Sequence, residues 1–380
     1  MVFVKENAPH IHRKDSLFRR RLDVLIALLP VVVAAFVYYP IAALRNILIS
    51  VAVRELCEFV FVLIYHRIPY DGNKHSLAEH FKHAIGCYTI DNAMVPLVSS
   101  VIYALIRPVA TTNPNFIYYP LIIGAIFGMV LGKLVFGGTG KNIFNPALVG
   151  RVFAKLCFGS KYANPASTTI APNEIFTGAT ALDPSKFSLA NKVYSINSSA
   201  LLDRFLGKRN GLLGETCKIA ILIGLVYLIV RHTIDWRIPA RYIGTVAFRS
   251  LIVGAIIYGG NKETLSASYP FAFRAYQLLS GGLLFGAVFR ATDPVTSPLT
   301  HPDRLIYAAF LGACTRVIRL FGSLPEGVAF SILMGNALTP VIGYYKWSTT
   351  KYTWKNRLVL GLVILIPTLI TIWASCRRVF

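Results

Sequence analysis

Long apolar runs recur from Leu22 almost to the end of the chain, and they decide what it can fold into. A helix needs roughly 17–25 apolar residues to cross about 30 Å of hydrocarbon, and these runs are long enough. They are continuous rather than alternating, which favours helices over a β-barrel. With 55% hydrophobic and 15% charged residues, an ordinary soluble domain is excluded. The sequence therefore predicts an all-α integral membrane protein.

The predicted helices form two blocks that are separated by one polar segment. The first block covers the ranges 22–40, 41–65, 91–107, 117–136 and 145–158. The second covers 213–231, 242–258, 274–289, 303–321 and 325–343, and a further apolar run follows at 357–375. The predicted divisions are a basic N-terminus (1–21), a first transmembrane repeat (22–158), a polar loop (159–212), a second repeat (213–343) and a C-terminal extension (344–380).

The two blocks resemble each other, which indicates an internal repeat. The segment 107–114 is matched in type by 290–298, and each precedes a long helix, a Phe-Gly turn and a short helix that contains proline. Five helices per block would insert the two copies in opposite directions, and such folds place their sites where broken helices meet near the midplane. We therefore predict about ten transmembrane helices in two inverted five-helix repeats with short broken helices, plus one C-terminal apolar helix.

The net charge of +22 comes mainly from Lys and Arg residues that flank the apolar runs. This distribution suits lipid headgroups and excludes nucleic acid as a partner. The basic loops after the second, sixth and tenth helices place the N-terminus in the cytoplasm and the loop 159–212 on the outer face. No cleavable signal peptide is evident. The expected location is the bacterial cytoplasmic (inner) membrane.

A glycine-rich turn at 135–147 is the densest signal in the transmembrane part. Gly137 and Gly138 allow the backbone to approach a ligand closely, and a proline begins a helix whose free N–H groups would face an anion or a ring carbonyl. Asn142 and Asn145 are further candidate cofactor-binding residues of the same turn. The spacing differs from that of a phosphate loop, which excludes nucleotide hydrolysis. Tight helix packing through glycine is the alternative.

Charged residues inside apolar runs are costly, so each needs a role. The candidate ion path comprises five carboxylates, namely Glu55, Glu58, Asp91, Asp293 and Glu326. Glu58 lies four residues after Arg54, and a structural pair between them is the first expectation. The last three lie at helix ends, where capping is expected and cation coordination is the alternative. The six cysteines occur singly, so no metal site or iron–sulfur cluster is predicted.

The polar loop contains a seven-residue run from Glu174 to Thr180. A threonine in such a loop is ordinarily a solvated turn residue. Here the run resembles D-x-x-[ST]-G-A-T, the recognition sequence of bacterial flavin transferases, with Glu174 in place of Asp and with Thr177, Gly178 and Ala179 before the last threonine. Those enzymes join the phosphate of flavin mononucleotide (FMN) to that threonine as a phosphoester. The resemblance implies covalent FMN on Thr180.

Several motifs occur in the order typical of the RnfD/NqrB family, which the chain resembles from about Pro9 to Ile342. They are RRRLDVLIALLP (19–30), FGGTGKNIFNPAL (136–148), TGATAL (177–182), DWRIP (235–239), ATDPVTSP (291–298) and PEGV (325–328). Family members are membrane subunits of the Rnf ferredoxin:NAD⁺ oxidoreductase and of the sodium-translocating NADH:quinone oxidoreductase. The resemblance implies electron relay through FMN, a second, non-covalent flavin (riboflavin) in the helical core, and coupling to Na⁺ or H⁺ transport.

The short leader before the first helix favours the RnfD branch, whereas the amino-acid sequence of the glycine-rich turn is more similar to that of NqrB. By the resemblance, the partners are other subunits of the complex, among them a second flavin-bearing subunit and membrane iron–sulfur subunits, together with a flavin transferase. The chain would act only as one subunit of an oxidoreductase, and no catalytic residue is assigned to it. Gly343 stands where family members tend to carry Asp, which puts ion coupling there in doubt. A solute channel or carrier and a cofactor-free scaffold are the competing functions.

Overall fold

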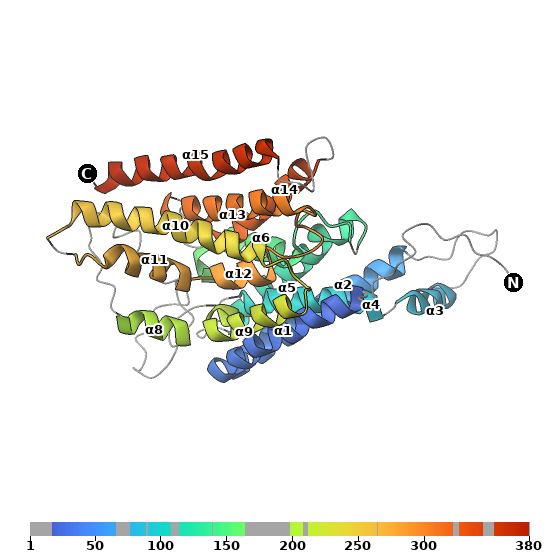
Figure 1. Ribbon diagram of the computed structural model, residues 1–380. Coiled ribbons are helices and arrows are strands. Elements are labelled where there is room, and N and C mark those ends of the chain that lie inside the picture. The colour runs from blue at the N-terminus through green and yellow to red at the C-terminus, as the bar shows by residue number, and fades with distance from the viewer. Residues whose placement is uncertain are drawn as a thin grey trace.

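The computed structural model describes residues 17–65, 77–88, 90–107, 114–138, 140–163, 198–207, 212–263, 265–321, 327–344 and 353–379. All regular structure in these ranges is helical (Figure 1). The first group of elements is α1 (Leu17–Tyr38), α2 (Pro40–Tyr65), α3 (Leu77–Cys87), α4 (Ile90–Leu105), α5 (Pro114–Gly132), η1 (Leu134–Phe136) and α6 (Pro146–Ala163). The second is α8 (Ser198–Leu206), η2 (Leu213–Glu215), α9 (Lys218–Val230), α10 (Arg237–Gly260), α11 (Tyr269–Leu279), α12 (Leu283–Phe289), α13 (His301–Phe321), α14 (Val328–Ile342) and α15 (Trp354–Val379).

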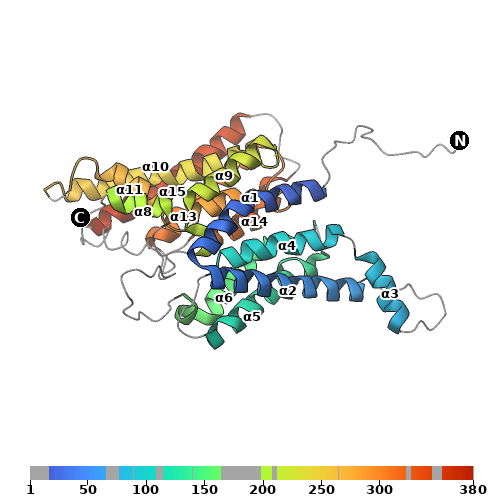
Figure 2. The same ribbon diagram turned by 90° about the horizontal axis from the view of Figure 1, so that it is seen from below.

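The two groups lie side by side, with α1 between them (Figure 2). Helices α2, α4, α5 and α6 pack together on one side, and α10 to α15 pack on the other. Asp23 of α1 joins α1 to the second group, because its carboxylate accepts hydrogen bonds from Tyr227 at 3.0 Å, Arg231 at 3.3 Å and Thr233 at 3.2 Å. This buried carboxylate therefore anchors α1 to α9 and the turn after it.

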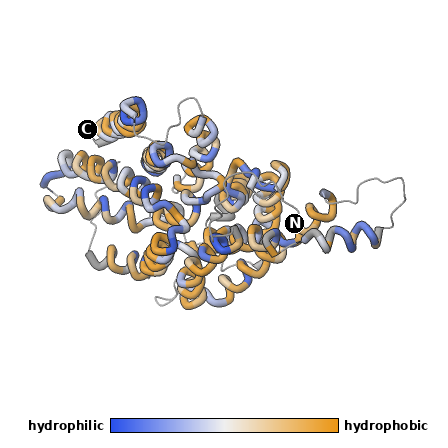
Figure 3. The backbone as a smooth tube through the Cα atoms, turned by 45° about the vertical axis from the view of Figure 1, so that its right-hand side comes forward, coloured by the Kyte–Doolittle hydropathy of each residue, from blue (hydrophilic) through white to orange (hydrophobic). Residues whose placement is uncertain are grey.

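Many large apolar side chains are exposed on the outside of the bundle, while several polar and charged ones are buried inside it together with an apolar core, the arrangement that lipid favours. Hydrophobic segments recur along the helices of both groups (Figure 3). On α15, Leu369 is 56% exposed and Trp373 64% exposed. Five arginines are instead almost completely inaccessible: Arg54, Arg249, Arg290, Arg316 and Arg319. By length and composition, 4 described helices can cross a membrane, or up to 5 if the bent pair α11–α12 is one span. The chain is a multi-pass membrane protein.

Helix α2 shows how one helix satisfies both environments. Its buried residues recur at intervals of three or four and are mainly polar: Ala43, Asn46, Ser50, Arg54, Glu58 and Val62. Its opposite face is apolar and includes Ile41, which is 78% exposed. A stripe with the period of the helix places these polar groups in the bundle and leaves the apolar face for lipid.

Helices α5 and α6 pack with their backbones in contact. Gly124, Gly128 and Gly132 recur at every fourth position of α5. A Cβ on Gly128 would lie only 2.5 Å from the carbonyl oxygen of Pro146 at the start of α6. Small residues at this spacing permit such close approach in membranes. Glycine-mediated packing therefore occurs in the helix just before the glycine-rich turn.

The observed boundaries differ from the predicted ones in two instructive places. The range 274–289 does not form one helix, because the chain breaks between α11 and α12 with a bend of 53°. Gly281 has a φ of 69° in this break, a conformation that glycine adopts without strain. Helix α3 was not predicted, since it is short and is not a continuous apolar run. The ten-span inverted repeat stays a prediction.

A charged cluster connects the loop before α10 to the start of α13. Asp235 accepts hydrogen bonds from the backbone N–H of Arg237 at 3.0 Å and from Arg304 at 2.7 Å, and His301 Nδ1 lies 3.3 Å away. Burial alone would raise the pKa of Asp235, but the Arg237 N–H and the Arg304 guanidinium outweigh it and hold that pKa below its ordinary value. The carboxylate therefore stabilises this junction while it is ionised.

Replacing Asp235 by asparagine is expected to lower the free energy of unfolding by about 1–3 kcal/mol at neutral pH, because the charge-assisted bond to Arg304 is lost. A carboxylate whose pKa falls on folding stabilises the protein above its unfolded pKa of about 4, and this contribution disappears as the pH drops through the folded pKa. The difference between the two proteins should therefore shrink below about pH 4. Thermal unfolding in detergent between pH 7 and pH 3 measures it, and a pH-independent difference would contradict the assignment.

Candidate functional site

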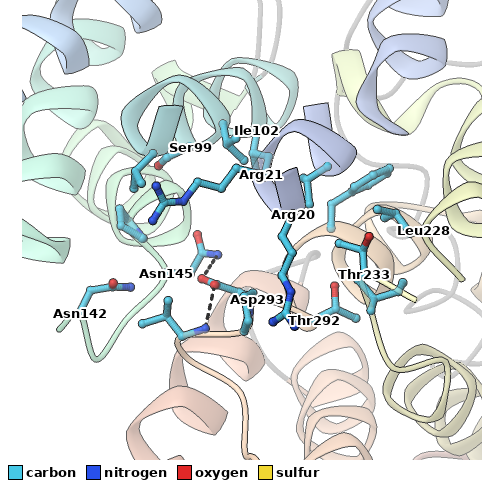
Figure 4. A pocket seen from close by; sticks show the side chains of 18 of the residues that line it. Arg20, Arg21, Ser99, Ile102, Asn142, Asn145, Leu228, Thr233, Thr292 and Asp293 are labelled. Carbon is cyan, nitrogen blue, oxygen red and sulfur yellow. Dashed lines mark hydrogen bonds between the residues drawn. The ribbon is translucent and has the colours of Figure 1, made fainter. Parts of the chain in front are cut away.

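A cavity of about 370 Å³ lies where the two groups of helices meet (Figure 4). It is enclosed by α1, α4, the turn between η1 and α6, the end of α9 with the turn after it, and α12 with its own following turn. Its walls are mainly apolar and include Val24, Ile102, Leu228 and Phe289. Its volume falls in the range of about 300–1,000 Å³ that is typical of small-molecule sites, which also combine apolar walls with a few polar groups.

The predicted glycine-rich turn forms part of this cavity. Gly137 and Gly138 have φ values of 99° and 88°, which a side chain would strain, and they turn the chain from η1 back towards α6. Neither is among the residues that line the cavity, whereas Asn142 and Asn145 are. The two glycines therefore shape the turn, and the two asparagines present their amides to the cavity.

A hydrogen bond between the two halves forms part of the cavity lining. Asn145 Nδ2 donates to Asp293 Oδ2 at 3.2 Å, although the two residues are 148 positions apart in the sequence (Figure 4). Asn145 Oδ1 also accepts the backbone N–H of Ala147 in the first turn of α6. Asp293 Oδ1 accepts the backbone N–H of Val295, so the carboxylate caps the turn after α12 rather than a helix. The glycine-rich turn and the 291–298 motif therefore meet at one point.

Three cationic side chains surround the same space. Arg20 and Arg21 extend into it from α1 (Figure 4), and Lys133 lines it from the end of α5. Among the described residues that line the cavity, Asp293 is the one acid. Amide, guanidinium and ammonium groups can donate to ring carbonyls or anions, and the carboxylate can accept a ring N–H. The arrangement suits a flat, mainly apolar ligand with a polar edge.

The buried ion pair beside the cavity differs from the predicted one. Glu58 Oε1 lies 2.8 Å from Lys133 Nζ, with side chains 4% and 1% exposed. Arg54 instead donates to the Ser99 hydroxyl, to the Ser99 carbonyl at 3.2 Å and to the Pro146 carbonyl at 3.3 Å. The predicted Arg54–Glu58 pair is therefore wrong. Both residues lie on the buried stripe of α2, but the long Arg54 side chain reaches α4 and α6 while Glu58 meets a cation from α5.

The remaining predicted site residues are placed only in part. Glu55 lies beside Glu58 on α2, and its Oε2 accepts the hydroxyl of Tyr88 at 2.7 Å. Asp91 lies in the first turn of α4, but its side chain is outside the described set. Glu326 and the run 174–180, with Thr180, fall outside the described residues. In the part of the chain that is described, no three His, Cys, Asp or Glu side chains are grouped to hold a metal ion.

Sequence reasoning missed Lys133, Arg20 and Arg21 as residues of the cavity. Lys133 interrupts the apolar run 117–136, and a charge in such a run is itself a signal for an inward-facing site. Arg20 and Arg21 were assigned to the basic start of the chain and to the family motif at 19–30, but not to a site. Nothing in their local sequence distinguishes residues that flank a membrane from residues that enter a cavity.

Together these features define a helical, multi-pass membrane protein with a ligand-sized cavity that is built from both of its halves. The model of the NQR2, RnfD, RnfE family matches residues 4–351. The chain belongs to this family.

Individual relatives match different shares of the chain. It is 29% identical over 344 residues to the D subunit of the proton-translocating ferredoxin:NAD(+) oxidoreductase complex of Clostridium ljungdahlii. This match covers 90% of this chain and 93% of that protein. It is 35% identical over 252 residues to the B subunit of the Na(+)-translocating NADH-quinone reductase of Chromohalobacter salexigens, covering 65% of this chain and 57% of the relative. The D subunit of the ion-translocating oxidoreductase complex of Stutzerimonas stutzeri is 36% identical over 246 residues, with 58% and 66% covered.

Proposed function

We propose that the chain is a membrane subunit of an ion-translocating redox complex of the Rnf type, and that it relays electrons through FMN esterified to Thr180. The observation that carries this proposal is membership of the NQR2, RnfD, RnfE family over nearly the whole chain, together with the flavin-transferase recognition run at 174–180. FMN supplies the redox chemistry, and the protein supplies position and electrostatics. A covalent tether keeps the flavin at high effective concentration on a polar loop.

Coverage favours the Rnf branch over the quinone reductase. The similarity to the D subunit of the Clostridium complex extends over 93% of that protein, whereas the similarity to the B subunit of the Chromohalobacter reductase covers 57% of it. The higher identity to the reductase protein keeps a subunit of NqrB type as the alternative. In either complex we expect the chain to lie in the bacterial inner membrane, with its N-terminus in the cytoplasm and the FMN loop on the outer face.

We place the second flavin, riboflavin, in the cavity between the halves. The donor set fits this group: Asn142 and Asn145 offer amides, Lys133 offers an ammonium, and Asp293 offers a carboxylate to a ring that has both carbonyl oxygens and an N–H. The apolar walls would contact the ring faces and exclude water. Riboflavin would provide a second electron carrier within the helical core, between the tethered FMN and the partner subunits.

The ion path is proposed along the carboxylates that lie near this cavity. Glu58 lies on the buried stripe of α2 and contacts Lys133, which lines the cavity, and the half-buried Glu55 lies one turn before it. Asp293 lies on the opposite side, in the second half of the chain. Such intramembrane acids commonly mark ion routes. Asp91 and Glu326 remain members of the proposed path by sequence alone, because the Asp91 side chain and Glu326 lie outside the described residues.

The decisive experiment is to digest the chain, purified from native host membranes, and to weigh the peptide that contains residues 174–192. We expect the mass of the peptide plus one FMN phosphoester, and a flavin-fluorescent band for the denatured chain. An unmodified peptide and a dark band would favour the channel, carrier or scaffold function. A channel would also conduct solute in the absence of redox partners, whereas a redox subunit would not.

Asn142→Leu is expected to lower the non-covalent flavin content of the purified complex about tenfold, because a buried polar edge of the ligand loses a hydrogen-bond partner. The local turn should survive, since Asn142 Nδ2 donates only to the Phe144 carbonyl among the described contacts. Acid precipitation separates released riboflavin from the protein-bound FMN, so the two flavins are counted separately. Asn261→Leu at the far end of α10 is the control and should retain both flavins.

A further inference from the structure

Helix α10 packs against α13 and α15 (Figure 1). On that side it borders an open groove of about 650 Å³. The groove shares no described lining residue with the cavity between the two halves. Its mouth is formed by Trp236, Arg237 and Arg241 at the start of α10. No carboxylate is among the described residues that line it. The mouth is therefore cationic and aromatic, and it needs an explanation that the proposed electron relay does not provide.

Beyond the mouth the groove becomes apolar. Gly244 and Phe248 line it from α10, and Ile364 lines it from α15. Phe248 is 52% exposed, and a Cβ built on Gly244 would meet no atom within 4 Å, so the floor at this glycine is open. Arg241 and Phe248 are seven residues apart, so the charged mouth and the apolar end are separated by about 10 Å along the helix.

Arg241 lacks a partner among the described residues. Its Nε is buried and has no hydrogen-bond partner, and its guanidinium forms no ion pair in the described structure. Arg237 differs, because it contacts His301 Nδ1 at 2.7 Å and lies 3.7 Å from Asp235. A partly buried guanidinium without an anion is unfavourable, so a partner from outside the chain is expected at Arg241.

One further cation, Lys355, lies level with the same end of the groove. Arg249 of α10 donates to the Pro367 carbonyl of α15, and Ile364 lines the groove beside Gly244 and Phe248. Helices α10 and α15 therefore run side by side in the same direction, and at 1.5 Å per residue the first turn of α15 lies level with the start of α10. That turn carries Lys355, which is exposed. Both helices place positive charge at this level.

We propose that the groove binds one anionic phospholipid. The headgroup phosphate would lie on Arg237 and Arg241, whose planar guanidinium groups match phosphate oxygens, and an acyl chain would follow Gly244 and Phe248. Trp236, which is 56% exposed, suits the membrane–water interface, and basic pockets between transmembrane helices are typical lipid headgroup sites. A free phosphate would leave the apolar part of the groove in contact with nothing, so the lipid is the better occupant.

Trp236 can report on the site directly. In the full-length chain, Trp347, Trp354 and Trp373 are replaced by phenylalanine, and the protein is reconstituted in nanodiscs of ordinary phosphatidylcholine. Phospholipids with brominated acyl chains, which quench tryptophan on contact, are then added. Brominated phosphatidylglycerol should quench Trp236 at a lower mole fraction than brominated phosphatidylcholine, by about fivefold for each arginine that contacts the headgroup.

Two variants separate the headgroup from the acyl chain. Arg241→Gln should reduce the preference for phosphatidylglycerol about fivefold, whereas Arg274→Gln, an exposed arginine on α11, should leave it unchanged. Gly244→Leu fills the open floor and should weaken quenching by both lipids. Gly259→Leu is its matched control, because a Cβ at Gly259 also meets nothing within 4 Å but lies away from the groove.

Several outcomes would overturn the proposal. Equal quenching by the two headgroups would show that the groove holds no anionic lipid in preference to bulk lipid. Loss of the phosphatidylglycerol signal on addition of inorganic phosphate would assign the site to a free anion. Failure of Gly244→Leu to change the quenching would place the lipid elsewhere. None of these results bears on the flavin measurements, so the lipid site and the proposed redox function are tested independently.

Discussion

Replacing Thr180 by alanine should abolish the flavin fluorescence of the denatured chain completely, because the hydroxyl oxygen that would form the phosphoester is gone. The loss should be total rather than graded, since the covalent attachment has one site in the proposed function. The measurement is in-gel fluorescence of the purified chain under ultraviolet light, with the mass of the 174–192 peptide as a second readout. The non-covalent riboflavin should be retained, because the described residues that line the cavity between the two halves all belong to other segments of the chain.

A matched control for this experiment lies in the same polar loop. Thr168→Ala removes a threonine hydroxyl outside the recognition run and should leave the fluorescence unchanged. Glu174→Asp restores the acid that the recognition sequence usually carries and should keep the label. A fluorescent Thr180→Ala band would show that FMN is attached elsewhere and would remove the basis for the relay through this residue.

The second large effect is expected at the ion pair between Glu58 and Lys133. Lys133→Met leaves a carboxylate that is 4% exposed without its cation, and breaking a buried pair from one side typically costs about 3–5 kcal/mol. We therefore expect a marked fall in the thermal midpoint or in the yield of folded protein in detergent. The double variant Glu58→Leu/Lys133→Met removes both charges and should recover most of the loss, because two apolar side chains can replace a buried pair at little cost.

Lys262→Met is the control for this pair. Lys262 is an exposed lysine in the turn after α10, so its removal changes the net charge equally but breaks no buried pair. If the Lys133 and Lys262 variants were equally stable, Lys133 would not be compensating a buried acid. If the double variant were as unstable as the single one, the damage would come from lost packing around Lys133 rather than from an unpaired Glu58.

Most helices could be placed from the sequence because lipid makes composition decisive. A polar residue on the outer face of a span is costly, so apolar runs such as 22–40 and 41–65 predict α1 and α2 to within a few residues at most ends. The same criterion fails where a helix does not cross hydrocarbon. It missed α3, and it joined α11 to α12, where Gly281 breaks the helix inside a stretch without charged residues.

Only some of the residues of the candidate site could be predicted from the sequence. Local signals identified the glycine-rich turn and its asparagines, because glycine and proline have backbone preferences that depend on few neighbours. The partner of Asn145 had no such signal, since Asp293 is 148 positions away and becomes its neighbour only when the halves pack together. The pairing of Glu58 was mispredicted for the same reason. The i,i+4 spacing within α2 pointed to Arg54, whereas the partner in the structure is Lys133, which follows α5.

By itself, the sequence determined that the chain is a helical membrane protein of one family, because hydropathy, charge placement and ordered motifs act locally along the chain. The tertiary structure decided which polar groups meet: Asn145 with Asp293, Glu58 with Lys133, and Asp23 with α9. The physical reason is that a polar group in a bundle must find a partner away from lipid. Several acceptable partners exist for each such group, and only the packing of the helices chooses among them.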